Sequence, residues 1–226
     1  MSHKDITIII TTYKSDKKIS NCVNSIDENY KILIVENSNN KEFKNFIENK
    51  FKNVECILAQ KNIGYAKSNN LALKKIDTKF ALILNPDTKL EKNCLKNFFK
   101  KIDEIDNKFS IIGPILNQDK SLYKNQKLNK NNLIDVPNVK GFGLFLNLEK
   151  IKKVDFFDEN FFLFFEEIDL CYRLKKIGEN IFIDPNIKIF HEGGSSSDND
   201  FVDETNIIKN WHWMWSTFYY HKKHKT

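Results

Sequence analysis

The first half of the chain alternates short apolar runs with segments in which apolar residues recur at helical spacing. After the run "DITIIITT", for example, Ile19, Cys22, Val23 and Ile26 follow the i, i+3, i+4, i+7 pattern of an amphipathic helix. This alternation predicts parallel strands joined by right-handed helical crossovers. We therefore expect an α/β fold with a mostly parallel central sheet flanked by helices. The expected strands cover residues 5–12, 30–36, 53–59 and 79–85, and the expected helices cover 16–28, 42–50, 64–76 and 91–105.

The second half of the chain is less regular. Residues 117–135 are rich in Asn, Lys and Gln, which is typical of an exposed hairpin or a mobile loop. The pattern divides the chain into one large domain, residues 1–204, and a C-terminal aromatic and basic helix, residues 205–226. We expect a strand at 138–147 and short strands around 180–190, with helices at 167–177 and 205–222.

Composition excludes several classes of protein. The apolar runs fall short of the ~20 residues that span a bilayer, and no signal peptide precedes the first strand, so we expect a cytoplasmic location. The net charge of +6 comes from scattered lysines and a single arginine, and no nucleic-acid recognition module is present. The four cysteines form no Cys-x-x-Cys pair, so buried reduced thiols are expected rather than a zinc or redox site.

A polar turn, Asn85-Pro86-Asp87, ends the apolar run "FALIL". Pro86 cannot donate a backbone hydrogen bond, so the strand must stop there. One interpretation is an ordinary turn, since all three residue types are common in turns. The other is a ligand or metal site, because α/β proteins place such sites at the carboxyl ends of strands. Glu36 ends the second expected strand, on what should be the same edge of the sheet.

A cluster of acids, Glu166, Glu167 and Asp169, opens the helix that follows "NFFLFF". Acids at a helix N-terminus complement the helix dipole. An aromatic wall can also raise the pKa of a carboxyl group towards that of a general base, and the residues alone leave both interpretations open. His191 precedes Gly-Gly-Ser-Ser-Ser and is either structural or a metal ligand beside a phosphate-binding loop.

The order of these features resembles a known family. Neither a dinucleotide fingerprint nor a P-loop is present, and the segments instead resemble glycosyltransferase family 2, with the GT-A nucleotide-diphospho-sugar transferase fold, in its rhamnosyltransferase-like branch. The resemblance spans residues 6–197. The matching segments are "IIITTY", "IVENS", "NIGYAKSNN", "LILNPDT", and "FFEEIDLCYRLKKIG" followed by "FHEGGSS".

The resemblance implies roles for the matching residues. It implies that Asp87 and His191 bind Mn²⁺ or Mg²⁺. It makes Glu167 the catalytic base and Asp169 a rival base, an orienting residue or an acceptor-site contact. In the acceptor half, residues 115–204, the expected acceptor and loop residues are Gly141, Gly143, Glu166 and Ser195. In the nucleotide-binding half, residues 1–114, a UDP- or dTDP-linked sugar would contact Thr11, Tyr13, Glu36 (where Asp is usual), Asn62, Gly64, Asn69, Asn85 and Asp87.

The chemistry of sugar transfer requires the same residue types, metal ligands and a general base. A divalent metal neutralises the charge on a leaving diphosphate, and an acceptor hydroxyl needs a base. One base, without a second carboxylate as nucleophile, predicts inversion. The resemblance thus implies an inverting hexosyltransferase that acts on a surface glycan such as lipopolysaccharide, capsule or a lipid-linked oligosaccharide. The alternatives are a catalytically weak sugar-nucleotide-binding or scaffold subunit, and a sugar nucleotidyltransferase, although "TTYKSDKK" lacks the glycines and arginine of the latter.

The C-terminal helix carries two expectations. Helical spacing places Trp211, Trp215, Phe218 and Tyr219 on one face, and the first expectation is that this face packs on the catalytic domain. Trp213 and Tyr220 fall outside that face, and the basic residues 222–225 follow them. Aromatic residues beside a basic cluster favour a bilayer interface. The second expectation is therefore peripheral association with an anionic membrane surface, at the inner face of the cytoplasmic membrane.

Overall fold

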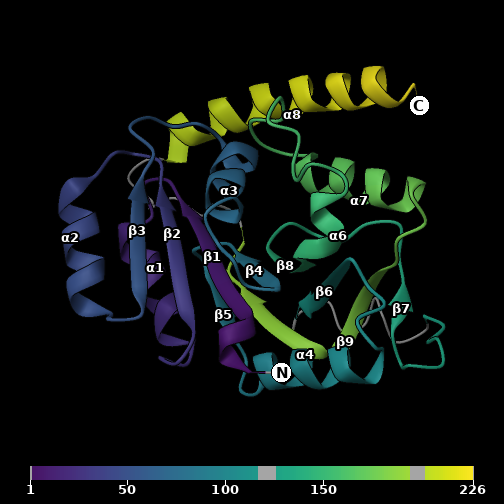
Figure 1. Cartoon of the computed structure of the whole chain (residues 1–226). Helices are drawn as coiled ribbons and strands as arrows, with labels where there is room; N and C mark the ends of the chain where they lie inside the picture. The colour runs from purple at the N-terminus through teal and green to yellow at the C-terminus, as the bar shows by residue number, and fades with distance from the viewer. Residues whose placement is uncertain (1, 117–125, 194–201, 226) are drawn as a thin grey trace.

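The computed structural model describes residues 2–116, 126–193 and 202–225, and the side chains of 202–205 lie outside the description (Figure 1). Its strands form one nine-stranded sheet in the order β3-β2-β1-β4-β8-β6-β9-β5, with β7 beside β9. The strands are β1 (Ile6–Thr12), β2 (Lys31–Glu36), β3 (Val54–Leu58), β4 (Phe80–Leu84), β5 (Thr88–Leu90), β6 (Ile111–Leu116), β7 (Ile134–Asp135), β8 (Gly143–Asn147) and β9 (Ile181–His191). The helices are η1 (His3–Asp5), α1 (Asp16–Asn24), α2 (Lys41–Lys50), α3 (Tyr65–Leu73), α4 (Cys94–Glu104), α6 (Leu148–Lys152), α7 (Glu166–Lys176) and α8 (Val202–His224).

The first half of the sheet is parallel, as the strand–helix alternation predicts. β1 pairs in parallel with both β2 and β4, and β2 pairs in parallel with β3. Thr12 lies opposite Glu36 and Ile10 opposite Leu84, so β1, β2 and β4 end at the same edge of the sheet. This edge is where parallel α/β sheets place ligands.

The expected mostly parallel sheet with flanking helices is observed, although its second half is mixed: β6 pairs in parallel with β9, and the other pairings there are antiparallel. β8 runs antiparallel to β4 and β6, and β5 and β7 run antiparallel to β9. β9 is one continuous strand rather than short pieces. A register shift between Pro114 and Ile115, opposite the segment that holds Pro185, lets the strand continue past a residue that cannot donate to its neighbour.

Two apolar clusters cover the two faces of the sheet. Alternate residues of β1 point to opposite faces, so Ile8 joins the cluster with α1, α2 and α4, and Ile9 joins the cluster with α3, α6 and α7. Phe98 of α4 and Phe145 of β8 stack at 3.9 Å between ring centroids in the first cluster. All four cysteines are buried free thiols, as expected. No helix in the described parts of the chain is both long and apolar enough to cross a membrane.

Helix α8 runs along the top of the molecule in Figure 1, above α3 and α7. Its inner face consists of Lys209, His212, Ser216, Tyr219 and Lys223, which recur every three or four residues. Ser216 is buried and donates to the backbone oxygen of Leu163 at 2.8 Å. Tyr219 donates to Asp158 at 3.0 Å. The inner face is polar because the surface below it presents backbone and carboxylate oxygens.

The outer face of α8 is apolar and exposed. Trp211, Trp215 and Phe218 are exposed by 57%, 41% and 56%, so the expectation that these residues pack on the catalytic domain is wrong. Only Tyr219 of that expected face is half-buried, and it packs edge-on against Phe161. With these residues we group Ile207 and Met214, exposed by 73% and 64% on the same side.

The carboxylate of Asp169 anchors α8 to α7. Asp169 is fully buried and accepts from Arg173 at 2.7 Å, from Lys223 at 2.5 Å and from His224 at 2.8 Å. Arg173 also donates to the backbone oxygen of Phe156 at 2.7 Å. The expected role of Asp169 as a rival base or acceptor contact is therefore not supported, because its oxygens hold cationic groups from two helices.

We predict that Asp169→Asn destabilises the protein by about 3–5 kcal/mol, because it removes one member of a buried ionic cluster and leaves Arg173 and Lys223 poorly compensated. Urea unfolding measures the loss, and limited proteolysis should show faster cleavage within α8. Asp106→Asn is the control, since its ion pair with Lys108 is exposed, and it should change stability by less than about 0.5 kcal/mol. Equal stability of the two variants would contradict the anchoring role.

Candidate active site

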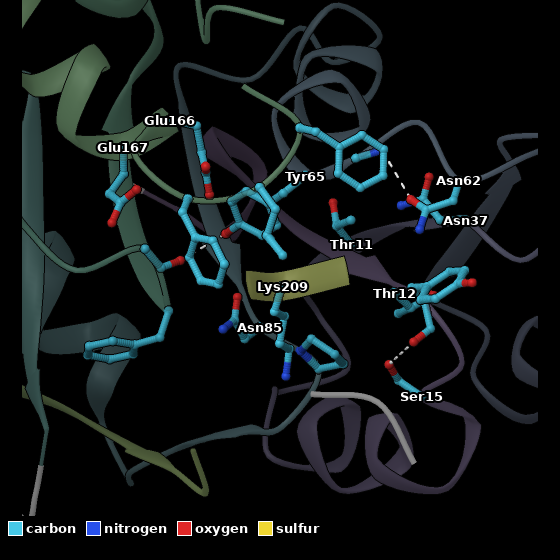
Figure 2. A pocket seen from close by; sticks show the side chains of 18 of the residues that line it. Thr11, Thr12, Ser15, Asn37, Asn62, Tyr65, Asn85, Glu166, Glu167 and Lys209 are labelled. Carbon is cyan, nitrogen blue, oxygen red and sulfur yellow. Dashed lines mark hydrogen bonds between the residues drawn. The ribbon is translucent and has the colours of Figure 1, made fainter. Parts of the chain in front are cut away.

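A cavity of about 460 Å³ opens where β1, β2 and β4 end, and this volume lies in the range of small-molecule sites. Strand ends and loops form its floor, the 162–164 loop and the start of α7 form one wall, and α8 contributes Ile208 and Lys209 (Figure 2). The predicted site residues that line it are Thr11, Tyr13, Asn62, Gly64, Asn85, Gly141, Glu166, Glu167 and His191. The lining residues that sequence reasoning did not single out include Thr12, Asn37, Tyr65, Lys140 and Lys209.

Two predicted nucleotide contacts lie behind the cavity or beside it. Asn69 is fully buried; it accepts from Thr11 at 3.2 Å and donates to the backbone oxygen of Tyr65 at 3.0 Å, so it positions Thr11 rather than lining the cavity. Glu36 is 1% exposed, and its carboxylate accepts from the backbone N–H groups of Ser38 and Asn40, both at 2.7 Å. Glu36 thus holds the turn after β2 through both carboxylate oxygens, and it is not among the residues that line the cavity.

Gly64 allows two segments to meet at the cavity wall. Its φ is +81°, and a Cβ atom there would lie 2.5 Å from the backbone oxygen of Phe162. The same oxygen accepts from the backbone N–H of Tyr65 at 2.7 Å. Asn62 supports the turn by accepting from the backbone N–H of Gly64 at 3.1 Å. The absence of a side chain at Gly64 therefore allows the 162–164 loop to approach, and the expected contact of Gly64 with a nucleotide stays a prediction.

Asp87 and His191 are brought together by the sheet. β5 pairs antiparallel with β9 so that Thr88 lies opposite His191, and His191 Nε2 lies 3.3 Å from Asp87 Oδ1. The imidazole also stacks on Phe142, with ring centroids 5.3 Å apart. His191 lines the main cavity, whereas Asp87 lines a neighbouring cavity of about 340 Å³, and Pro86 lines both.

This pair fits a hard divalent cation. A carboxylate and an imidazole suit Mn²⁺, and the carboxylate suits Mg²⁺. The described residues contain no group of three or more His, Cys, Asp or Glu side chains placed to hold a metal. Mg²⁺ commonly binds to nucleotide substrates through one or two protein side chains together with phosphate oxygens, and the two ligands Asp87 and His191 would suit that kind of site.

Glu166 and Glu167 form the acidic end of the cavity. Burial raises the pKa of Glu166 well above its usual range, and the neighbouring charge of Glu167 raises it further. Burial also raises the pKa of Glu167, against the opposing effect of backbone N–H groups at Glu167, Ile168 and Gly141. One Glu166 oxygen is buried without a hydrogen-bond partner among the described residues, whereas Glu167 is half-exposed. Glu167 is therefore the acid that a substrate can reach.

The segment before these acids holds them in place. Phe164 and Phe165 adopt positive φ angles of 69° and 67°, a conformation that costs energy for bulky residues and requires support from the surroundings. Trp213 of α8 packs against both rings, with centroids 5.3 and 5.5 Å away. The start of α7 thus depends on α8.

The remaining predicted acceptor residues have different positions. Gly141 lines the cavity, and its backbone oxygen accepts from the Tyr65 hydroxyl at 2.8 Å. Gly143 lies within β8, where a Cβ atom would meet Pro114 at 3.0 Å, so its small size serves strand packing. Ser195 lies outside the described residues.

Sequence and structure comparisons point to one family. Residues 7–173 match glycosyl transferase family 2. The low-salt glycan biosynthesis hexosyltransferase Agl10 of Haloferax volcanii is 26% identical over 199 residues, which cover 78% of this chain and 64% of Agl10. The rhamnosyltransferase WbbL of Escherichia coli is 24% identical over 222 residues, which cover 82% of this chain and 83% of WbbL.

Solved structures share the fold. The mannosyltransferase PcManGT from Pyrobaculum calidifontis, in complex with GDP-Man and Mn²⁺, aligns with a TM-score of 0.67 at 13% identity, covering 83% of this chain and 56% of its own. S. aureus TarS 1–349, in complex with UDP-GlcNAc, aligns with a TM-score of 0.64 at 16% identity, covering 84% of this chain and 60% of its own. The chain thus spans less than two thirds of Agl10 and of both solved chains.

We predict that Glu166→Gln stabilises the protein more at pH 8 than at pH 5. Because folding raises the pKa of Glu166, the folded state retains a proton that the unfolded chain releases, so stability falls as pH rises from the ordinary carboxyl range through the raised pKa. Glutamine does not ionise, so the Glu166→Gln variant should not lose folding stability in this way as pH rises. Urea unfolding at pH 5 and pH 8 measures the change in the free energy of unfolding. Glu149→Gln is the control, because Glu149 is exposed. A pH-independent effect of Glu166→Gln would show that Glu166 titrates normally.

Proposed function

The chain belongs to glycosyl transferase family 2 and has the GT-A fold, and we propose that it transfers a sugar from a nucleotide-diphospho-sugar to a hydroxyl group of a glycan acceptor. One observation carries this proposal: a single cavity is bordered by the acid pair Glu166–Glu167 and by His191, which contacts Asp87. A metal-binding pair and a general base are the two groups that such a transfer requires.

We assign the donor to the strand ends. Thr11, Thr12, Tyr13 and Asn37 would contact the nucleoside, and Asn85 would contact the sugar or its ribose. Asp87 and His191 would hold Mn²⁺ or Mg²⁺, which when bound neutralises the charge of the leaving diphosphate. PcManGT and TarS, which share the fold, were solved with GDP-Man and UDP-GlcNAc; this supports a nucleotide sugar as donor, and we propose a UDP- or dTDP-linked sugar.

We assign the catalytic base to Glu167. Its carboxylate is the accessible member of the pair, and it would take the proton from the acceptor hydroxyl. Glu166 is more deeply buried and therefore less accessible to the donor sugar, so it would not serve as a second, nucleophilic carboxylate. Direct attack by the acceptor then inverts the configuration of the anomeric carbon.

We place the acceptor on a lipid carrier at the inner face of the cytoplasmic membrane. The outer face of α8 exposes Ile207, Trp211, Met214, Trp215 and Phe218. The exposed Lys222 and Lys225 continue this face, and each lysine near an anionic surface contributes about 1 kcal/mol to binding. Agl10 is a hexosyltransferase of glycan biosynthesis and WbbL is a rhamnosyltransferase, which supports a surface-glycan acceptor for this chain.

A panel of UDP-, dTDP- and GDP-linked sugars, assayed for release of nucleoside diphosphate with Mn²⁺, tests the proposed donor chemistry. We predict that one donor class is hydrolysed slowly, that chelation of the metal stops the reaction, and that Asp87→Ala lowers the rate at least 100-fold. Metal-dependent binding without turnover, with or without acceptor, would favour the sugar-nucleotide-binding or scaffold subunit instead. Wild-type activity in Asp87→Ala would refute its assignment to the metal.

Glu167→Gln should leave donor binding unchanged and slow transfer by about 10²–10⁴-fold, the usual effect of losing a general base. Because burial raises the pKa of Glu167, the wild-type rate should rise with pH through that pKa as the carboxylate ionises. Steady-state rates across pH measure both effects. A mild effect of Glu167→Gln beside a severe effect of Glu166→Gln would transfer the role of base to Glu166.

Sedimentation with liposomes tests the membrane contact. The intact chain should pellet with anionic vesicles at low salt and less at high salt, since exposed charge interactions are screened. The double variant Trp211→Ala/Phe218→Ala should lose most of this binding. Phe46→Ala is the matched control, because Phe46 is 49% exposed on α2 and outside the outer face of α8. Equal pelleting of both variants, or none by the wild type, would exclude the membrane contact.

A further inference from the structure

The inner face of α8 brings one lysine to the cavity. His212 stacks on Phe162 with ring centroids 4.1 Å apart, and Ser216 bonds to Leu163, so this face is seated on the 162–164 loop. Lys209 lies three residues before His212 and therefore points to the same side of the helix. It lines the cavity, and Figure 2 shows it beside Asn85.

The electrostatic surroundings of Lys209 differ from those of the other lysine on the described cavity wall. Lys140 precedes Gly141, the backbone N–H of which bonds to Glu167, so Lys140 belongs to the acidic end. Lys209 lies at the end formed by Asn85, Pro86 and His191. Partial burial lowers the pKa of Lys209, while the charge of Asp87 raises it, which places the ammonium within electrostatic reach of that carboxylate.

This end of the cavity would receive the diphosphate of the donor. A diphosphate must be held close to Asp87 and His191 if these two residues bind the metal, and the acids at the other end repel it. An ammonium group is a compact charge with three donors and binds phosphate oxygens well. Resting on the proposed function, we infer that Lys209 binds the donor diphosphate and stabilises it as it leaves.

The inference gives α8 a second role. The same helix presents its outer face to solvent and is fixed to α7 through Asp169. When α8 is packed on α7, it places the positive charge of Lys209 in the donor site. Release of α8 from α7 would remove that charge from the site. Donor affinity should therefore depend on a helix that begins outside the matched family region, residues 7–173.

Calorimetric titrations with UDP, UMP and uridine, and with the thymidine series, test the inference in the full-length chain with Mn²⁺ present. For Lys209→Ala we expect the affinity for the nucleoside diphosphate to fall about 10-fold or more, as for loss of a hydrogen bond to a charged group. Uridine or thymidine affinity should stay unchanged. Lys209→Arg should retain most of the diphosphate affinity. Lys100→Ala is the control and should bind like the wild type, because Lys100 lies on α4 with its side chain 78% exposed and does not line the cavity.

These titrations distinguish a wrong role for Lys209 from a wrong proposed function. If the wild type prefers the diphosphate and Lys209→Ala shows the same preference, the role of Lys209 is wrong and the proposed function stands. If the wild type binds neither nucleotide series, the proposed function fails and the inference fails with it. Thermal melting of each variant shows that it is folded, and Lys209→Arg keeps the test valid should Lys209→Ala unfold.

Discussion

The pairing of β5 with β9 joins two parts of the chain that are far apart in sequence, and the chemistry of the cavity depends on it. β4 ends at a proline, and the chain turns through Asp87 into β5, which is only three residues long. β5 has one partner strand in the described sheet, and the register of that pairing sets Thr88 opposite His191. β9 in turn is fixed by β6 and β7. A carboxylate and an imidazole therefore meet because of backbone hydrogen bonds, before any ligand is bound.

The second half of the site depends on α8. The acids at the start of α7 follow two phenylalanines in strained backbone conformations, and Trp213 packs on both. Asp169, two residues after Glu167, ties α7 to Lys223 and His224. The acid pair, the loop that forms the cavity wall and Lys209 thus share one supporting helix. Changes on α8 should alter the cavity even where they touch no substrate.

Much of the fold could be predicted because its signals are local. Helical spacing and apolar runs located β1 to β4 and α1 to α4 to within a few residues, and Asp87, Glu167 and His191 were identified from their positions at element ends. Short antiparallel elements were missed, since β5 and β7 have three and two residues and leave no periodic pattern. The continuous β9 was also missed: short strands were expected around 180–190, whereas a register shift opposite the segment that holds Pro185 lets one strand continue.

Errors in the site arose where tertiary partners decided the role of a residue. Asn69, Glu36 and Asp169 are polar residues at motif positions, but internal hydrogen bonds and ion pairs occupy them. The face of α8 that packs is polar because carboxylates and backbone oxygens lie beneath it, so counting apolar residues selected the wrong side. Lys209 could not be singled out from the sequence, because it is one lysine among many. Only the packing of α8 against the 162–164 loop, which places Lys209 at the cavity, distinguishes it.

The central claim is that the pair Asp87–His191 forms the metal end of a nucleotide-sugar site. Anomalous diffraction from crystals grown with Mn²⁺ and a nucleoside diphosphate tests it most directly, because the metal is located without reference to any activity. We expect one strong peak within about 2.0–2.6 Å of an Asp87 oxygen and of His191 Nε2, distances typical of oxygen and imidazole ligands, with the diphosphate beside it. A diphosphate bound with its metal elsewhere, or no metal at this pair, would show that Asp87 and His191 do not form the metal site.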